Sequence, residues 1–202
     1  MIAKHHRSSI KLSAVLLAGG KSRRMGQDKA AIIFRGKPLW QIQLDLLRSL
    51  EPQEILVSAQ ADPTWRPLDV RFVPDNSPSR GPLGGLCASL AEIRSSHLIV
   101  LAIDMPFMNE KFLRSLSHNI QPGCGALPMI ENRAEPLAAI YPVQVHPDLV
   151  AALSGTDFSL QAVTTKLVAA GKLKVIHVAN EEEIFFRNLN EPADLGESIG
   201  HR

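Results

Sequence analysis

Short apolar runs alternate along the chain with stretches in which apolar residues recur at helical spacing. The run Leu98–Ile103 is the most strand-like, since it is apolar on both faces as a central parallel strand would be. Ser13–Ala18 is a similar run that ends in Gly19-Gly20, which predicts a buried strand feeding a loop. The expected strands are Ser13–Ala18, Glu54–Ser58, Val70–Val73, Leu98–Ile103, Ala126–Ile130, Leu137–Tyr141 and Lys174–Val178.

Helical periodicity fills the segments between these runs. Pro38 opens one such stretch, in which apolar residues return every three or four positions from Leu39 to Leu50. A second expected helix follows a turn-rich loop, Gly81–Gly85, and carries Leu86, Leu90 and Ile93 on one face. Further helices are expected over Val145–Leu153, Ser159–Ala170 and Pro192–Ser198. Alternating strands and helices predict an α/β sandwich with a mostly parallel sheet.

Sheets of this kind bind ligands beyond the carboxyl ends of their strands, so the polar residues that follow strands are the candidates for chemistry. Four segments qualify, namely Gly19–Lys29, Ser58–Asp62, Asp75–Gly85 and Asp104–Pro106. We expect residues 1–12 to be a flexible basic tail and residues 13–202 to form one domain, because no repeat or long linker divides the chain.

Charge, hydropathy and cysteine content exclude several classes of function. The 22 basic and 20 acidic residues give a formal charge of +2, which argues against a dedicated nucleic-acid-binding domain. No apolar run approaches the roughly 20 residues of a bilayer span, and the basic N-terminus leads to no signal-peptide core, so we expect a cytoplasmic protein with no membrane partner. Cys87 and Cys124 match no metal or redox spacing and are interpreted as small apolar residues.

The segment Leu17–Lys29 holds three glycines and four cations directly after a strand. Glycines let backbone N–H groups approach an anion closely, and the cations add charge where a phosphate would lie. Neither familiar phosphate loop fits. The Walker motif needs a glycine where Val15 stands, and Gly19-Gly20 followed by Gly26 is not the dinucleotide fingerprint, which disfavours a Rossmann oxidoreductase.

This loop, LAGGxSxRMGxDK, resembles the signature of the enzymes that transfer NMP from an NTP, and in particular the molybdenum cofactor guanylyltransferase family. The resemblance extends from about residue 13 to residue 196 through an ordered set of motifs. The matching segments are Gly36–Leu39 (GKPL), Asp75, Gly81–Gly85 (GPLGG), Asp104–Phe107 (DMPF), Glu135–Leu137 (EPL) and Asn188–Leu195 (NLNEPADL). It implies a Rossmann-like three-layer sandwich of the nucleotide-diphospho-sugar transferase type.

The family reaction joins GMP from GTP to the terminal phosphate of molybdopterin and releases pyrophosphate. Because the attacking phosphate is already ionised, no protein base is needed, and catalysis rests on positioning and charge neutralisation. The resemblance implies that Arg24 and Lys29 clamp the phosphates and that Asp104 holds Mg²⁺, a hard ion that takes one or two carboxylates plus substrate phosphates.

The resemblance also implies the remaining contacts. GTP and molybdopterin are the expected substrates, with transient contact to molybdoenzyme maturation proteins. Asn188 and Asn190 resemble positions on the acceptor side; the alternative is a local turn that caps the last helix. Where the family often has asparagine, this chain has Ser58, which leaves base selectivity open. The expected nucleotide-binding residues are Leu17, Ala18, Gly19, Gly20, Lys29, Ser58, Asp75, Gly81, Gly84 and Asp104.

Three other functions remain open at this stage. Within the class, the chain could be a cytidylyltransferase acting on the same cofactor or a sugar-phosphate nucleotidyltransferase. Outside it, the chain could be a nucleotide-binding subunit that only delivers the cofactor. The combination of Arg24, Lys29 and Asp104 argues against simple delivery, because binding alone needs no metal carboxylate at the phosphates. Glu135, the first residue of the EPL segment, and Arg133, two residues before it, have no role that the sequence defines.

Overall fold

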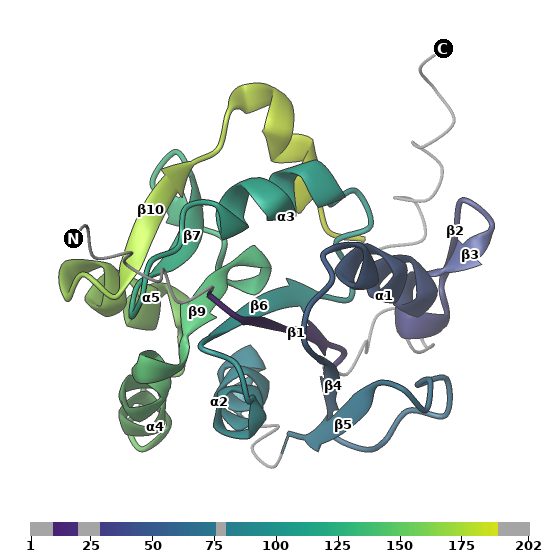
Figure 1. Cartoon of the computed structure of the whole chain (residues 1–202), viewed down its shortest axis with the longest axis horizontal. Coiled ribbons are helices and arrows are strands. Elements are labelled where there is room, and N and C mark those ends of the chain that lie inside the picture. The colour runs from purple at the N-terminus through teal and green to yellow at the C-terminus, as the bar shows by residue number, and fades with distance from the viewer. Residues whose placement is uncertain (1–9, 20–28, 76–79, 190–202) are drawn as a thin grey trace, which may run out of the picture.

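The structure is a computed structural model in which residues 10–19, 29–75 and 80–189 are described (Figure 1). Its centre is an eight-stranded sheet in the order β10-β7-β9-β6-β1-β4-β5, with β8 paired to β7. The strands are β1 (Leu12–Leu17), β4 (Ile55–Ala59), β5 (Arg71–Pro74), β6 (His97–Ala102), β7 (Gly125–Ile130), β8 (Arg133–Ala134), β9 (Ile140–Pro142) and β10 (Leu173–His177).

Most of this sheet is parallel, as the alternation of strands and helices predicts. Strand β1 runs parallel to β4 and β6, β4 runs parallel to β5, and β7 runs parallel to β10. Strand β9 is antiparallel to both β6 and β7, so it reverses direction between two strands that share one orientation. All parallel strands therefore present their carboxyl ends at the same edge of the sheet.

Helices cover both faces of the sheet, giving three layers (Figure 1). They are α1 (Leu39–Ser49), α2 (Pro82–Glu92), α3 (Glu110–Ser117), α4 (His146–Leu153) and α5 (Leu160–Ala169). Side chains of α1 and α3 belong to one buried cluster, and those of α2, α4 and α5 belong to the other. Within β6, Ile99 and Leu101 join the first cluster, whereas Leu98 and Val100 join the second, as the two-residue period of a strand requires.

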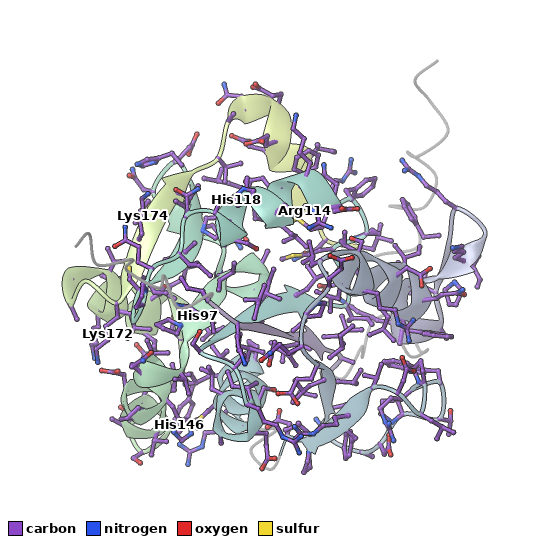
Figure 2. The ribbon with its side chains drawn as sticks, viewed as in Figure 1. His97, Arg114, His118, His146, Lys172 and Lys174 are labelled. Atoms are coloured by element: carbon purple, nitrogen blue, oxygen red, sulfur yellow. The ribbon has the colours of Figure 1, made fainter. Side chains whose placement is uncertain are left out.

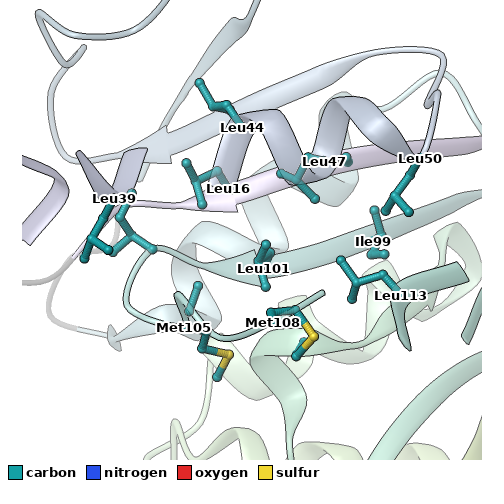
Figure 3. Close-up of a cluster of buried hydrophobic side chains, with 14 of the residues drawn as sticks. Leu16, Leu39, Leu44, Leu47, Leu50, Ile99, Leu101, Met105, Met108 and Leu113 are labelled. Carbon is teal, nitrogen blue, oxygen red and sulfur yellow. The ribbon is translucent and has the colours of Figure 1, made fainter. Parts of the chain in front are cut away.

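Figure 3 shows part of the first cluster, in which side chains of α1, β1 and β6 lie with those of the segment that follows β6. Leu39, Leu44 and Leu47 of α1 are fully buried against β1 and β6. Met105 and Met108, which follow β6 in the chain, are 2% and 6% exposed and close the same cluster. Burying a leucine or methionine side chain contributes about 1.5–3 kcal/mol, so the backbone of the Asp104–Phe107 segment is anchored by its apolar members.

The main departures from the expected elements lie where helices and turns meet. The Gly81–Gly85 segment is not a loop that precedes a helix, because α2 begins inside it at Pro82. The expected strand Leu137–Tyr141 is a 3₁₀ turn over Pro136–Ala138 before β9 begins at Ile140. Helix α3 was not expected from the sequence, although Asn109 caps it by accepting a hydrogen bond from the Phe112 N–H at 2.9 Å.

A short hairpin was likewise not predicted. It consists of β2 (Ile33–Phe34) and β3 (Lys37–Pro38), joined by Arg35 and Gly36, both with positive φ. This hairpin is what leads into α1, which begins at Leu39, one residue after the expected Pro38. Most of the expected tail and the expected helix Pro192–Ser198 lie outside the described residues, while β1 starts at Leu12 rather than Ser13.

Candidate active site at the carboxyl edge of the sheet

Backbone hydrogen bonds bring the residues that follow β1, β4 and β5 into one row. The Ala18 N–H donates to the Ser58 carbonyl oxygen at 2.9 Å, and the Asp75 N–H donates to the Ala59 carbonyl oxygen at 2.8 Å. These bonds extend the parallel ladder one residue beyond the strands. The predicted nucleotide-binding residues of three separate segments are thereby placed side by side.

Lys29 and Asp104 join two further segments at this edge. Lys29 Nζ lies 2.8 Å from Asp104 Oδ2, across 75 residues of sequence. The two side chains are 23% and 19% exposed, so the pair lies in a partly screened position where charges interact more strongly than on an open surface. Asp104 follows β6, as expected, and two of the three residues assigned to phosphate and metal chemistry are in direct contact.

The last described residues of the chain cross beside Asp104. The Leu189 N–H donates to the Asp104 carbonyl oxygen at 2.9 Å, which fixes the neighbouring Asn188 near the same strand end. Asn188 Oδ1 is buried and has no hydrogen-bond partner within the described residues. A buried amide oxygen without a donor is uncommon and is a candidate for ligand contact. Asn190, the other expected acceptor residue, lies outside the described residues.

Gly19 and Asp75 come close enough to form one wall of the predicted nucleotide site. A Cβ atom added at Gly19 would stand 3.9 Å from Asp75 Oδ2. Gly81 adopts φ 62° and ψ −154°, a backbone conformation that L side chains rarely adopt, and Pro82 then starts α2. The Gly84 N–H donates to the Gly81 carbonyl oxygen at 3.2 Å. The second glycine segment is therefore a tight helix start rather than an open turn.

Ser58 is placed differently from the other predicted base contacts. Its side chain is 2% exposed and packs under α2, where a Cβ on Gly85 would approach Ser58 Oγ to 2.9 Å and Leu17 Cδ2 to 3.3 Å. Ser58 Oγ has no hydrogen-bond partner in the described part of the chain. The strand end and α2 are thus in close contact, and beyond the strand ladder the Ser58 carbonyl oxygen accepts the hydrogen bond from the Ala18 N–H.

Arg80, just before α2, contacts the carboxyl-terminal end of α4, a helix of the same layer. Its guanidinium donates to the carbonyl oxygen of Leu153, the last residue of α4, and its Cζ lies 4.2 Å from the ring centroid of Phe158. A cation at a helix carboxyl terminus and over an aromatic face is favourable on both counts. Because Arg80 directly precedes Gly81, these contacts hold the second glycine segment in position.

Aromatic contacts support the loop that follows Asp104. The Phe34 and Phe107 rings meet edge to face at 5.2 Å, which fastens the β2–β3 hairpin to the Asp104–Phe107 segment. The Arg35 guanidinium lies 5.1 Å from the Phe34 centroid and 6.0 Å from that of Phe107. Since Lys29 precedes this hairpin, the same contact restrains both partners of the Lys29–Asp104 pair.

Most of the predicted site residues are thus gathered at one edge. Gly20 and Arg24, like Asn190, fall outside the described residues, so their assignment stays a prediction. Glu135, to which the sequence alone assigns no role, has a side chain that is 12% exposed and a carboxylate that lies 3.7 Å from Arg133 Nε. Burial raises the pKa of Glu135, and Arg133 only partly opposes this effect.

Figure 2 labels six histidine, lysine and arginine side chains that come from several elements, namely His97, Arg114, His118, His146, Lys172 and Lys174. His97 begins β6 and Lys172 directly precedes β10, so these two belong to the opposite, amino-terminal edge of the sheet. Several already have partners, since Lys172 Nζ binds Asp148 Oδ2 at 2.6 Å and Lys174 Nζ donates to Asn119 Oδ1 at 2.9 Å. This edge is therefore not the one at which the predicted phosphate-binding residues meet.

Fold and site together define a nucleotidyltransferase. Residues 14–180 match the family model described as the MobA-like NTP transferase domain, so the chain belongs to this family. The chain is 33% identical over 186 residues to a probable molybdenum cofactor guanylyltransferase of Opitutus terrae, covering 91% of this chain and 92% of the relative. It is 32% identical over 183 residues to the molybdenum cofactor guanylyltransferase of Xanthomonas euvesicatoria, covering 89% and 90% of the two chains.

Solved structures agree on the architecture. The molybdopterin-guanine dinucleotide biosynthesis protein A of Archaeoglobus fulgidus superposes with a TM-score of 0.68 and 26% identity, covering 92% of this chain and 96% of that one. A nucleotidyl transferase of Methanothermobacter superposes with a TM-score of 0.73 at 15% identity, covering 93% and 95%, which supports the fold alone. The expected Rossmann-like, mostly parallel α/β fold and the family resemblance are both confirmed.

Proposed function

We propose that this protein transfers GMP from GTP to the terminal phosphate of molybdopterin, with Mg²⁺ as cofactor. The observation that carries the proposal is the Lys29–Asp104 contact of 2.8 Å at the strand edge where Gly19, Asp75 and Asn188 also lie. The names of the relatives supply the substrate pair. In the reaction, a phosphate oxygen of the acceptor forms a bond to the α-phosphorus of GTP as the bond to the β-phosphate breaks and pyrophosphate leaves.

The residues of this edge suit a divalent ion that is shared with the substrate. Within residues 10–19, 29–75 and 80–189, no three His, Cys, Asp or Glu side chains are grouped to hold a metal ion by themselves. Mg²⁺ is usually held by one or two carboxylates together with substrate phosphates, and Asp104 supplies such a carboxylate. When bound, the ion would polarise the phosphate oxygens and offset their charge.

The other site residues would bind the two substrates. Lys29 would bind the triphosphate, aided by backbone N–H groups of Ala18 and Gly19 and by Arg24 and Gly20. Asp75 would accept hydrogen bonds from the guanine edge beside Gly81 and Gly84, and Leu17 and Ser58 would shape the floor beneath it. Asn188 and Asn190 would bind the acceptor. No side chain needs to remove a proton, because the attacking phosphate is already anionic.

The cellular setting belongs to the same proposal. No helix in the described residues is long and apolar enough to cross a bilayer. Cys87 and Cys124 are both free thiols, which is the usual state in a reducing compartment. We therefore propose a cytoplasmic location, where GTP is available, and transient contact with the proteins that pass the finished cofactor to a molybdoenzyme.

Pyrophosphate release tests this function directly. Each of GTP, CTP, ATP and UTP would be supplied with Mg²⁺, with and without molybdopterin, and with a sugar phosphate as a second acceptor. We expect release only with GTP and molybdopterin together. Release with CTP and molybdopterin would instead identify a cytidylyltransferase, and release with the sugar phosphate would identify a sugar-phosphate enzyme. Tight GTP binding without release in the presence of the acceptor would favour a cofactor-delivery protein.

A further inference from the structure

The Glu135 carboxylate is largely buried without the hydrogen bonds that usually compensate burial. Its side chain is 12% exposed, and the approach of Arg133 Nε at 3.7 Å is its only polar contact in the part of the chain that the structure describes. The Arg133 side chain is 78% exposed, so solvent screens most of its interaction with the Glu135 carboxylate. A partly desolvated carboxylate that lacks N–H donors is suited to accept them from a ligand.

The strand pairing places Glu135 at the same sheet edge as Asp104. The Glu135 N–H donates to the Pro128 carbonyl oxygen at 2.9 Å, near the carboxyl end of β7. From there the chain returns along β6, first as the 3₁₀ turn Pro136–Ala138 and then as β9, which pairs antiparallel to β6. Residues that precede this return therefore lie toward the carboxyl end of β6, which Asp104 follows.

Glu135 also lies on the side of β6 that faces away from the nucleotide segments. In the sheet order, β7 and β9 flank β6 on one side, whereas β1, β4 and β5 flank it on the other. Gly19 and Asp75 follow β1 and β5, so the nucleotide side is already taken. The acceptor must then approach from the side of β7 and β9. Asn188, whose Oδ1 has no hydrogen-bond partner in the described residues, directly precedes Leu189, whose N–H binds the Asp104 carbonyl oxygen.

We propose that Glu135 is a specificity residue that recognises the pterin ring of the acceptor. This inference rests on the proposed function, which makes a pterin phosphate the second substrate. A pterin presents two adjacent donors, the 2-amino group and the ring N3–H, and one carboxylate can accept both in a bidentate arrangement. The contact orients the ring so that its phosphate points toward Asp104, and it supplies the donors that the protein does not.

Variants at Glu135 give one test, with Glu131 as the matched control. Glu131 is an exposed glutamate in the turn between β7 and β8, so E131Q removes the same charge nearby without touching the buried carboxylate. We expect E135Q to raise the KM for molybdopterin by at least about tenfold and to leave the Kd of GTP within about twofold, because one bidentate charged contact is lost. E135D should recover part of the loss, and E131Q should resemble the wild type.

The unaltered protein gives a second test that does not depend on how a variant folds. The probes are 6-hydroxymethylpterin and 6-hydroxymethyllumazine, which differ in that the lumazine has an oxygen in place of the 2-amino group. We expect the pterin to compete with molybdopterin at least about tenfold more strongly than the lumazine. In E135Q this preference should disappear.

The outcomes separate the two proposals. Equal inhibition of the wild type by both probes, or an E135Q enzyme with unchanged KM for molybdopterin, would overturn the assignment of Glu135 while leaving the transfer of GMP intact. A wild-type protein that releases no pyrophosphate from GTP in the presence of molybdopterin would overturn the proposed function and this inference together.

Discussion

Lys29 Nζ and Asp104 Oδ2 are 2.8 Å apart although 75 residues separate them in the chain. The contact joins the end of the glycine-rich signature to the segment that follows the central strand β6. It therefore places the proposed phosphate-binding cation and the proposed metal-binding carboxylate within reach of one ligand.

Replacing Asp104 should abolish transfer without unfolding the protein. We expect Asp104→Ala to lower kcat by about 10³-fold or more, because the group that holds the charge-neutralising ion is lost. The pair with Lys29 is partly exposed, so its removal should cost about 1 kcal/mol of stability or less. Mg²⁺-dependent pyrophosphate release and thermal unfolding measure the two effects. Asp45→Ala, which breaks an exposed pair with Lys37, is the control, and full activity of Asp104→Ala would refute the metal-binding role.

Replacing Lys29 should act mainly on the nucleotide. A charge-assisted hydrogen bond to phosphate contributes about 1.5–3 kcal/mol, so Lys29→Ala should weaken GTP binding by about 10- to 100-fold and also slow turnover. Isothermal titration with GTP and Mg²⁺ measures the first effect. Lys37→Ala provides the comparison, since it removes an exposed lysine from the adjoining hairpin. Unchanged affinity together with unchanged turnover would exclude Lys29 from the site.

Gly85 is expected to tolerate no side chain. A Cβ there would stand 2.9 Å from Ser58 Oγ and 3.3 Å from Leu17 Cδ2, so the buried Ser58 side chain, α2 or β4 must shift. We expect Gly85→Ala to destabilise the fold by about 1–3 kcal/mol and to weaken GTP binding, since α2 begins and β4 ends at the nucleotide side. Urea unfolding measures the first effect.

A double variant checks the cause of that loss. Ser58→Ala removes the closest atom, and by itself it should cost little, because Ser58 Oγ has no hydrogen-bond partner in the described residues. Adding it to Gly85→Ala should restore part of the lost stability, so the two changes should be non-additive. Strict additivity of the two free energies would show that the Ser58 contact is not responsible.

His97 should make the fold sensitive to mild acid. Its ring is fully buried, with Nε2 donating to the Gln121 carbonyl oxygen at 3.0 Å, and burial lowers its pKa despite that bond. The unfolded chain, with an ordinary histidine pKa near 6.5, takes up a proton before the folded protein does. Stability is therefore complete above about pH 6.5 and falls as the pH drops from there toward the lower folded pKa.

The pH dependence of the melting temperature measures this effect. The wild type should lose stability between about pH 6.5 and 5, a range above the titration of ordinary carboxylates. His97→Asn should melt at a lower temperature overall but with a flatter profile over that range. His118→Gln, which replaces an exposed histidine, should keep the wild-type slope. An unchanged slope in His97→Asn would show that another group controls the acid response.

Much of the architecture could be read from the chain because the signals were local. A sheet that is covered on both faces requires apolar runs in its strands, as in β1 and β6, and one apolar face on each covering helix, as in α1. Both patterns are visible within a few consecutive residues. The glycine-rich signature and the D-M-P-F segment likewise identified Lys29 and Asp104 as separate candidates. The omitted helix α3 had a usable signal in its Asn109 cap and in the helical spacing of Phe112, Leu113 and Leu116.

Other features depended on contacts between distant segments, and no local pattern encodes those. The sequence presented Gly81–Gly85 as a loop, whereas packing against Leu17 and Ser58 allows the helix to begin inside it. It presented Glu135 as the first residue of the EPL segment without a defined role, and only the fold buries its carboxylate at the carboxyl edge of β6 and β7. The chain alone thus determined which residue types and elements are available, because periodicity and backbone propensity act over a few residues. Tertiary structure decided which charges meet and which remain unpaired, because burial and distance are set by the whole sheet.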